Sequence, residues 1–353
     1  MKQLAVAILA LAAASTASGQ ADPHPTLTVG GVTARRGEKV TGVIVVPAGS
    51  DSGYSMPVAI VHGARPGPVL AIASGAHGTE YASIIAVERL IAALDPARIA
   101  GSVILLPLIN VASFEQKVPH VNPIDRKSMN RFYPGSMTGT QTERASALIT
   151  QQVVEQSDHL IDLHGGDLDE NLRPYSYWTV SGNARQDSIS RGMVLAFGLD
   201  HIIVSTDRPK DPAASRYLEN TATARGKPSL TAEAGRAGRT DAADVSALVK
   251  GSLGVMAYLG MIDRPVRSVR RPVWVDKVVT VSSEQTGIFY PLVDRDARVD
   301  AGQKLGYVTD YVGKTIFDAL SPAAGRILFI RAVPSMTKGE TIANVGVLRG
   351  ATP

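Results

Sequence analysis

Hydrophobic and polar residues follow two different periods along this chain. Residues 26–50 alternate as in β-strands and end in a turn. From residue 57 onward, short apolar runs alternate with segments of helical period, as in PVLAIAS (68–74) followed by TEYASIIAVERLIAALD (79–95). Strands that alternate with helices of this length predict an α/β fold whose sheet is mixed, largely parallel and flanked by helices.

The same reading predicts the other elements of this region. The expected strands are 57–63, 102–110, 159–165, 201–206 and 229–235, and the expected helices are 143–157 and 243–261. The rhythm breaks at RPVRSVRRP (264–272), which holds two prolines and four arginines. Beyond it, strand-like runs are separated by Gly, Pro and Asp. We therefore predict an α/β domain over 26–265 and a small all-β domain over 272–350.

The first 20 residues have the three parts of a secretory signal peptide. Lys2 is the positive start, Leu4–Ala14 the apolar core, and Ala17-Ser18-Gly19 a cleavage site of small residues. A retained membrane anchor is the alternative, but the apolar run is short for a bilayer. We predict cleavage of 1–20, no stable membrane insertion afterwards, and an exported protein, periplasmic or secreted.

Composition narrows the class of partner. The net charge is +4 and the chain has 44% hydrophobic residues, with Lys and Arg scattered among acids. Because there is neither a basic block nor a basic-aromatic alternation, nucleic acid is not an expected partner. The chain has no cysteine, so a transition metal would be held by His, Asp or Glu.

Two strand ends carry metal-ligand types. His77 and Glu80 follow the strand 68–74, and His164 closes the strand 159–165 just before two glycines. Ligands of open α/β sheets bind at the carboxyl ends of strands, and His2Glu is a ligand set of catalytic zinc sites. Asp162 lies two residues before His164, on the same strand face, either to orient that histidine or as a solvated acid.

Two further segments carry chemistry. Glu233, late in the strand 229–235, is either a general base for a metal-bound water or a salt-bridge partner of Arg236 or Arg239. Asn130-Arg131, in RKSMNRFYPG (126–135), suits a substrate carboxylate, although a surface arginine is the alternative. His62, at the end of the strand 57–63, is predicted to be structural. The histidines with no motif around them are predicted to be structural or solvated: His120, His159 and His201.

The order of these segments resembles the zinc carboxypeptidase-like superfamily, and more closely its succinylglutamate desuccinylase/aspartoacylase branch. HGARPGPVLAIASGAHGTE (62–80) resembles the opening of that branch, and MNRFYPG its NRxFPG segment. DLHGG and AEAG resemble the strands of the third ligand and of the general base. The resemblance covers roughly 30–350 and implies a zinc-carboxypeptidase-like fold.

The resemblance also implies a role for each matching residue. One Zn²⁺ per chain would be held by His77, Glu80 and His164, with Glu233 as the general base. Asn130 and Arg131 would bind the substrate carboxylate. Arg126 would polarise the scissile carbonyl and stabilise the oxyanion, although its spacing from Asn130 departs from the family pattern. Zinc is the metal expected from this ligand set, although cobalt or manganese could occupy the same site in vitro.

The C-terminal segment resembles the small β domain of this branch, which is similar to biotinyl or lipoyl carrier modules. In the family this domain shapes the entrance of the active site. Lys314 follows Gly313 in an expected hairpin, but the carrier motif around a modified lysine is absent, so an ordinary loop lysine is expected.

Three functions remain open at this point. The resemblance favours a deacylase that cleaves the amide bond of an N-acyl amino acid. An exported metallocarboxypeptidase acting on short peptides or cell-wall stem peptides is the second reading. The third is a periplasmic binding protein on the same fold, which would have lost a ligand or the base. The expected partner in each case is a small molecule or short peptide.

Overall fold

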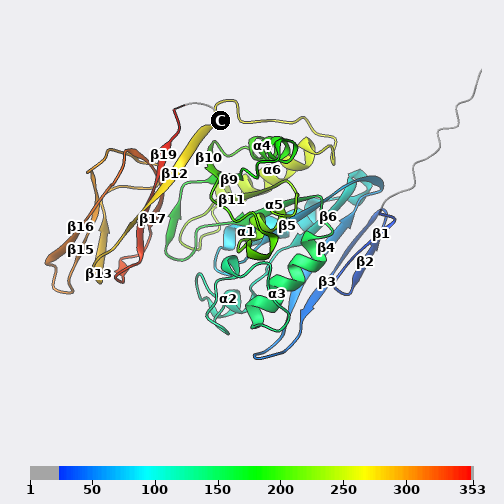
Figure 1. Cartoon of the computed structure of the whole chain (residues 1–353), viewed down its shortest axis with the longest axis horizontal. Coiled ribbons are helices and arrows are strands. Elements are labelled where there is room, and N and C mark those ends of the chain that lie inside the picture. The colour runs from blue at the N-terminus through cyan, green and yellow to red at the C-terminus, as the bar shows by residue number, and fades with distance from the viewer. Residues whose placement is uncertain (1–23, 351–353) are drawn as a thin grey trace, which may run out of the picture.

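The computed structural model describes residues 24–350, so the predicted signal peptide lies outside the described residues. A 13-stranded mixed sheet runs across the molecule (Figure 1). The strands before the linker are β1 (Thr26–Val29), β2 (Val32–Arg35), β3 (Glu38–Val46), β4 (Tyr54–His62), β5 (Arg65–Ser74), β6 (Ala100–Leu106), β7 (His159–His164), β8 (Glu170–Leu172), β9 (Tyr175–Thr179), β10 (His201–Ser205) and β11 (Ser229–Glu233). The helices are α1 (Tyr81–Ala93), α2 (Val111–Gln116), α3 (Gln141–Ile149), α4 (Ala184–Phe197), α5 (Leu218–Thr223) and α6 (Ala242–Tyr258).

Parallel pairing dominates the middle of the sheet. Strand β5 lies between β6 and β7 and is parallel to both, and β7 is parallel to β11. Strand β9 then pairs with β11 in the antiparallel sense and with β10 in the parallel sense. The predicted mixed sheet flanked by helices is therefore confirmed, although parallel pairing prevails only in its middle, because the strands at both ends of the sheet pair in the antiparallel sense. Strand β9, α4 and α5 were not among the elements predicted from the sequence.

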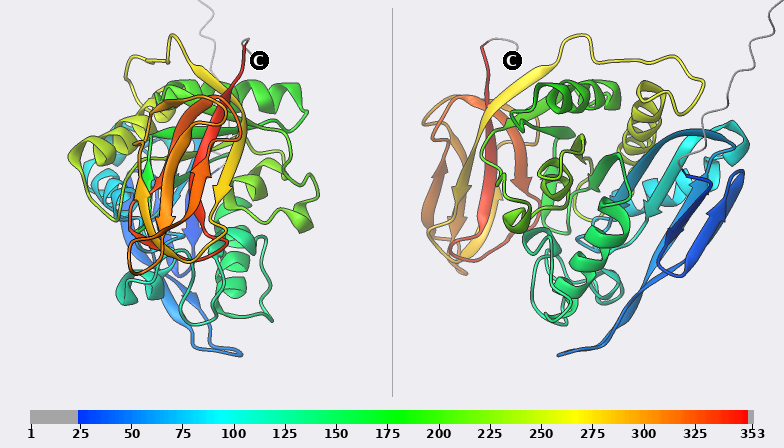
Figure 2. Two further views of the ribbon diagram at one scale, coloured as in Figure 1. Left: turned by 90° about the vertical axis from the view of Figure 1, so that its left-hand side faces the viewer. Right: turned by 45° about the vertical axis from the view of Figure 1, so that its right-hand side comes forward.

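Alternation along β5 builds a separate core on each face of the sheet. Leu70 and Ile72 face α1, α4 and α6 in one buried cluster, whereas Val69 and Ala71 face α3 and α5 in the other. Figure 2 shows these helices on opposite sides of the strands. Near-continuous apolar runs such as PVLAIAS are typical of strands covered on both faces.

Local sequence explains where the helices begin and end. Helix α3 starts with a capping box between Thr140 and Glu143, and α4 starts at Asn183, whose side chain accepts from two backbone N–H groups. Helix α4 ends at Gly198, which has a φ of 94° that favours glycine. The helix expected over 143–157 is regular only to residue 149, because residues 150–154 continue as a π-helix.

Four of the eight strands described after residue 272 extend the same sheet, and the other four form a separate one. The eight strands are β12 (Val273–Ser282), β13 (Gly287–Pro291), β14 (Arg298–Val299), β15 (Lys304–Thr309), β16 (Thr315–Leu320), β17 (Gly325–Arg331), β18 (Ser335–Met336) and β19 (Thr341–Leu348). Strand β12 is parallel to β10, and β19 and β17 follow it outward. Strands β16, β15, β13 and β18 form the separate four-stranded sheet, so the C-terminal region is all-β as predicted, and β1 and β2 form a two-stranded sheet of their own.

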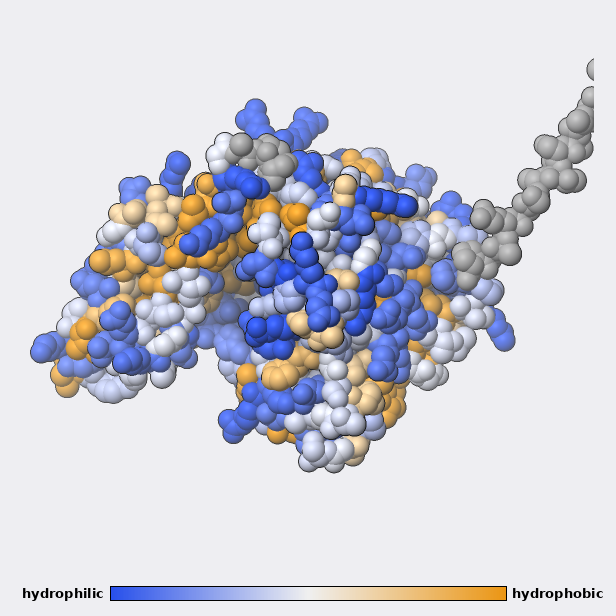
Figure 3. All heavy atoms as spheres, viewed as in Figure 1, coloured by the Kyte–Doolittle hydropathy of each residue, from blue (hydrophilic) through white to orange (hydrophobic). Residues whose placement is uncertain are grey.

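The segment between α6 and β12 carries no named helix or strand and coincides with the predicted linker around 265–272. The division into two domains itself stays a prediction. None of the helices among residues 24–350 combines the length and the hydropathy needed to cross a membrane. Figure 3 shows hydrophobic residues gathered where the C-terminal strands meet the main body, and hydrophilic residues over most of the rest of this face.

Asp169 joins three distant parts of the chain. Its carboxylate lies 2.8 Å from His120 Nε2 and 2.8 Å from Nη1 of Arg331, which is nearly buried in β17. The backbone of Asp169 also accepts from Ala332 N–H at 2.8 Å. His120 Nδ1 lies 3.1 Å from the buried carboxylate of Asp167. His120 is thus structural, as expected, and it ties the loop before residue 128 to β8 and β17.

The His120 contacts predict a pH-dependent contribution to stability. Burial lowers the pKa of His120, but the hydrogen bond with Asp169 and the charges of Asp167 and Asp169 outweigh it and raise the pKa to about 9. A raised pKa in the folded state stabilises the protein below the unfolded value of 6.5, and this contribution is lost as pH rises through about 9. We expect His120→Gln to lower the free energy of unfolding at low pH only. Because the imidazole is 43% exposed, the effect should stay below about 1 kcal/mol.

Urea unfolding of wild type and His120→Gln, from below pH 6.5 to above pH 9, measures the difference in the free energy of unfolding directly. His159→Gln is the matched control, because burial lowers the pKa of His159 and the sign of its pH dependence should be opposite. A wild-type advantage over His120→Gln that grows toward high pH would contradict the assignment of the ion pair.

Candidate metal centre and catalytic pocket

Neighbouring strand ends bring the predicted metal ligands together. Strands β5, β7 and β11 lie side by side and are parallel, so their carboxyl ends reach one edge of the sheet. His77 lies in the turn after β5, Glu80 is the N-cap residue of α1, and His164 is the last residue of β7. Residues 77 and 164 are far apart in sequence, and the parallel register places them at the same site.

The three predicted ligands point at one another. His77 Nδ1 lies 2.8 Å from Glu80 Oε1, and His164 Nδ1 lies 3.0 Å from Glu80 Oε2. One donor atom from each of the three residues lies within 4.8 Å of the others. Glu80 and His164 are buried, and His77 is partly exposed toward the cavity. This geometry makes the three residues a candidate metal centre.

The buried charges of this cluster depend on one another. Burial alone would raise the pKa of Glu80, but the charges and hydrogen bonds of His164 and His77 hold it well below its usual range. Burial would lower the pKa of His164, and the charges of Glu80, Asp162 and Glu233 raise it instead. Oppositely charged partners within hydrogen-bond distance therefore offset the cost of taking these groups out of water.

Asp162 and Asn130 lie on the other side of the His164 ring. Asp162 Oδ1 is 3.4 Å from His164 Nε2, and Asn130 Nδ2 is 2.9 Å from the same nitrogen. The Nδ1 atom of His164 faces Glu80 while Nε2 faces these two polar groups. Asp162 thus lies where a residue that orients a ligand histidine would be, the first of the two roles considered for it.

Glu233 ends β11 directly beside His164. The parallel register pairs Glu233 with His164, and the antiparallel register pairs it with Tyr175 of β9. Burial raises its pKa well above the usual range, and nearby Glu80, Glu170 and Asp162 raise it further, whereas His164 lowers it. Glu233 therefore has the environment of a group that exchanges protons.

The neighbouring arginines do not form a salt bridge with Glu233, which was the alternative to its role as a general base. Arg236 Nε lies 2.8 Å from one oxygen of Asp241, and Arg239 Nη2 lies 3.0 Å from the other. Both arginines thus pair with Asp241. Glu233 instead lines the same cavity as the three candidate metal ligands.

Close backbone approach allows β7 and β11 to end side by side. A Cβ added to Gly166 would lie 2.6 Å from Gly235 O and from Arg236 Cα. A Cβ added to Gly235 would lie 2.6 Å from Gly166 N. The glycines of DLHGG and AEAG are therefore required by packing at the floor of the site, in addition to any effect on the chain direction.

Asn130 and Arg131 also reach the cavity. They lie in a 3-10 turn (Met129–Arg131), where Arg131 Nη1 donates to Asn130 O at 2.7 Å. The Arg131 guanidinium lies 4.8 Å from the centre of the Tyr217 ring. Both residues line the same cavity as His77, Glu80, His164 and Glu233.

Arg126 is not brought to the site. Its side chain is exposed, it is absent from the residues that line the cavity, and it has a φ of 61° in the preceding loop. The polarising role implied by the family resemblance therefore has no support from its position. Arg208, which had no motif around it, is the arginine that lines the cavity together with Arg131.

The cavity has a volume of about 240 Å³, and many of its walls could not be read from the sequence. The residues missed are Glu170, Leu172, Tyr175, Tyr177, Arg208, Tyr217, Glu219, Thr231, Phe329 and Asn344. Tyr175 and Tyr177 alternate along YSYWT, a period of two that could have indicated one strand face. Arg208 and Tyr217 lie in a loop without periodicity, and Phe329 and Asn344 come from C-terminal strands β17 and β19.

Glu170 is one of five described residues with a carboxyl group on this cavity wall, beside Glu80, Asp162, Glu219 and Glu233. Burial raises its pKa to about 7, and the charge of Glu80 contributes in the same direction. Its carboxylate accepts from Asp167 N–H at 3.1 Å. The pocket therefore combines several carboxyl groups with two arginines, and it is suited to a polar ligand with charges of both signs.

Comparisons with known proteins agree with this arrangement. The sequence model of the succinylglutamate desuccinylase/aspartoacylase catalytic domain matches residues 66–259. N-alpha-acetyl-L-2,4-diaminobutyric acid deacetylase of Halomonas elongata is 24% identical over 312 residues, which cover 86% of this chain and 90% of that protein.

Solved structures show the same fold. The succinylglutamate desuccinylase/aspartoacylase of Rhodobacter sphaeroides has a TM-score of 0.78 at 22% identity, covering 89% of this chain and 96% of that one. The product-bound ectoine utilization protein EutE (DoeB) of Ruegeria pomeroyi has a TM-score of 0.81 at 21% identity, covering 92% and 99%.

The ligand geometry predicts that Glu80 carries metal-dependent stability. In wild type, a divalent cation at a hundred times its dissociation constant should raise the free energy of unfolding by about 2.7 kcal/mol. Glu80→Gln removes the central negative charge, so this increment should largely disappear. Thermal unfolding with and without a chelator, together with elemental analysis, measures both the increment and the bound metal.

Glu88→Gln is the matched control, because Glu88 lies exposed on the same helix α1. It should keep both the bound metal and the chelator-sensitive increment. Full metal content and an unchanged increment in Glu80→Gln would rule out Glu80 as a ligand.

Proposed function

The chain belongs to the succinylglutamate desuccinylase/aspartoacylase family, and from this premise we propose that it is a zinc-dependent hydrolase of N-acyl amino acids. It would cleave the amide bond and release a carboxylic acid and an amine. The observation that carries the proposal is the cavity in which His77, Glu80 and His164 converge with Glu233 at their side. The deacetylase relative acts on an acylated amino acid, which supports this substrate class.

The donor set supports zinc as the metal. Two imidazole nitrogens and one carboxylate oxygen within 4.8 Å of one another fit a site in which zinc has three protein ligands and an open position. When bound, zinc polarises a carbonyl group and lowers the pKa of a bound water toward neutrality. Asp162 would accept from His164 Nε2–H and hold the ring so that Nδ1 keeps facing the ligand position.

Glu233 would move the proton. Its carboxylate would accept a proton from the attacking water and deliver it to the nitrogen of the leaving amine. In the protein alone, burial favours the protonated form of Glu233. A cation beside it acts in the opposite direction and favours the ionised form needed at the start of the reaction.

Arg131 and Arg208 would bind the carboxylate of the amino-acid part. Both guanidinium groups contact the ring of Tyr217, at 4.8 Å and 3.9 Å from its centre. Tyr217 would thus hold two planar cations at the wall of the cavity, and a guanidinium matches a carboxylate in a bidentate manner. We assign no role in this step to Arg126, because its side chain is exposed outside the cavity.

We also propose that the enzyme acts outside the cytoplasm, after removal of residues 1–20. The support is the charged start, apolar core and small-residue site within those residues. Export would give the enzyme access to acylated amino acids outside the cell. Fractionation of cells that produce the full chain, followed by N-terminal sequencing of the mature protein, tests this part.

Glu233→Gln should separate catalysis from metal binding. The amide has nearly the same shape as the carboxylate but cannot accept the proton, so we expect kcat to fall by about 10²–10⁴-fold. The zinc content should stay equal to that of wild type. Release of free amine from a panel of N-acyl amino acids and short peptides gives kcat, and elemental analysis gives the metal.

The panel also decides between the functions left open by the sequence. Turnover of N-acyl amino acids supports the proposal, and preferential release of a C-terminal residue from peptides would replace it by carboxypeptidase activity. Tight binding with no turnover by zinc-loaded wild type would indicate a binding protein.

If Arg131 binds the substrate carboxylate, Arg131→Lys should lower the affinity for substrates that carry this carboxylate. A lysine keeps the charge but loses the planar pair of donors, so KM for N-acetyl amino acids should rise about tenfold, which corresponds to about 1.4 kcal/mol. KM for the matching N-acetyl amino acid amides, which lack the carboxylate, should change little. Arg89→Lys, on the exposed face of α1, is the control. An equal rise in KM for acids and amides would exclude a carboxylate contact.

A further inference from the structure

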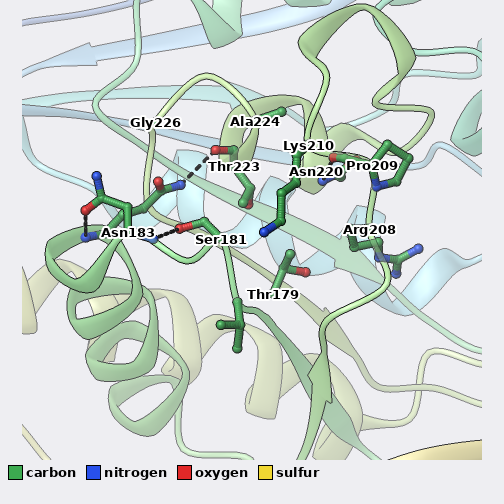
Figure 4. Close-up of a pocket in the computed structure, with 12 residues that line it drawn as sticks. Thr179, Ser181, Asn183, Arg208, Pro209, Lys210, Asn220, Thr223, Ala224 and Gly226 are labelled. Atoms are coloured by element: carbon green, nitrogen blue, oxygen red, sulfur yellow. Dashed lines mark hydrogen bonds between the residues drawn. The ribbon is translucent and has the colours of Figure 1, made fainter.

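A second cavity of about 200 Å³ adjoins the catalytic pocket. Arg208 lines both cavities, and β9 and α5 each contribute residues to both. Its walls come from the end of β9, the start of α4, the loop that holds Arg208 and Lys210, and α5 (Figure 4).

Strand β9 and helix α5 run from one cavity into the next. Tyr177 lines the catalytic pocket, and Thr179, two residues further on the same strand face, lines the second cavity. Glu219 lines the catalytic pocket, and the next residue, Asn220, lines the second cavity. The two cavities therefore lie next to each other, with Arg208 between them.

The charge of the second cavity differs from that of the catalytic pocket. None of the described residues that line it has a carboxylate, whereas Lys210 supplies an amino group. Figure 4 shows this amino group directed across the cavity toward Ser181, and a Cβ added to Gly182 would lie 3.6 Å from Lys210 Nζ. The guanidinium of Arg208 points away from Lys210 in this view and contacts Tyr217 instead.

Asp187 lies behind the Ser181–Gly182 turn, and its carboxylate is engaged by that turn and does not pair with Lys210. Its Oδ1 accepts from the N–H and the hydroxyl of Ser181, at 2.8 Å and 2.7 Å, and its Oδ2 accepts from Gly182 N–H at 3.0 Å. These bonds hold the turn at the start of α4. Lys210 is itself an exposed residue, so its amino group is accessible to an anion that enters the cavity.

Asn220 supplies the complementary group. Its side chain is only 1% exposed, and Nδ2 donates to Pro209 O at 3.1 Å, which fixes the orientation of the amide. Oδ1 has no hydrogen-bond partner within the described part of the chain. A buried acceptor without a donor is costly, so a ligand with an N–H group would satisfy it.

We propose that this cavity binds a small molecule that carries both a carboxylate and an N–H donor. The carboxylate would pair with Lys210, and the N–H group would donate to Asn220 Oδ1. Amino acids and N-acyl amino acids have these two groups a short distance apart, and a cavity of this volume suits a ligand of that size. The choice of ligand class rests on the proposed function, whereas binding at Lys210 and Asn220 can be measured without it.

Calorimetry with the full-length, zinc-loaded Glu233→Gln protein tests the proposal, because this protein should not consume the probe. N-acetylglycine, titrated at low ionic strength, should give two binding events. Adding Lys210→Glu should weaken one of them at least tenfold, and adding Arg131→Met should weaken the other. Lys250→Glu, an exposed charge reversal on α6, is the matched control and should weaken neither.

Analogues identify which groups are read. N-acetylglycinamide lacks the carboxylate and butanoate lacks the N–H group, so each should bind at least tenfold more weakly at the Lys210-sensitive site. Asn220→Ala should remove the preference for N-acetylglycine over butanoate. Tighter binding of N-acetylglycine than of glycine at this site assigns it to the acylated amino acid, and the reverse order assigns it to the free one.

The two proposals fail in different ways. An Arg131-sensitive event without a Lys210-sensitive one overturns the second site and leaves the proposed function standing. A Lys210-sensitive event in a protein that releases no amine from any acylated substrate supports the second site and counts against the proposed function. Equal affinity of the Lys210-sensitive site for N-acetylglycine, N-acetylglycinamide and butanoate would also overturn the proposal.

Discussion

A carboxylate almost completely removed from water, that of Glu80, lies between the imidazole rings of His77 and His164. Such a group is tolerated only when charged or donating partners surround it. The backbone N–H of Gly165 also donates to it at 3.0 Å, so β5, β7 and the start of α1 are held together at this point. The spacing of the central strands and the glycines at their ends serve this one arrangement.

The sheet carries the arrangement far beyond the three ligands. Strand β11 brings Glu233 beside His164, and β9 brings its tyrosines beside Glu233. Through β10 and β12 the hydrogen-bonded ladder continues into the C-terminal strands. Phe329 and Asn344 therefore reach the same cavity as residues made more than 150 positions earlier in the chain, such as His77 and His164. A single continuous ladder fixes the distances between all of them.

Sequence reasoning succeeded where a residue stands at the end of a periodic apolar run. His77, His164 and Glu233 follow or close strands that alternation and β-branched content identify, and parallel strands share one functional edge. Their convergence could be expected for that reason, and family resemblance added the order of the segments. Residues in loops gave no such signal. Arg126 was carried over on an uncertain spacing, and Arg208 occupies the cavity without any motif to mark it.

Pairing between distant strands was equally hidden. The local sequence pattern of β9 does not indicate that this strand runs antiparallel to β11. The pattern of β12 likewise does not indicate that it pairs with β10. The break at 264–272 marked a change in composition, but a linker in the chain is not a gap in the sheet. Register depends on tertiary packing, which overrides local preference.

The position of β8, only three residues long and paired with β17, has a consequence for the order in which the molecule is made. A ribosome synthesises His77, Glu80, His164 and Glu233 before any of the C-terminal strands exist, and folding tends to proceed from the N-terminal end. The donor cluster can therefore assemble on a sheet whose outer edge is still unpaired. Its wall at Phe329 and Asn344 comes from β17 and β19, so the cavity is complete only when the last strands of the chain have paired with the sheet.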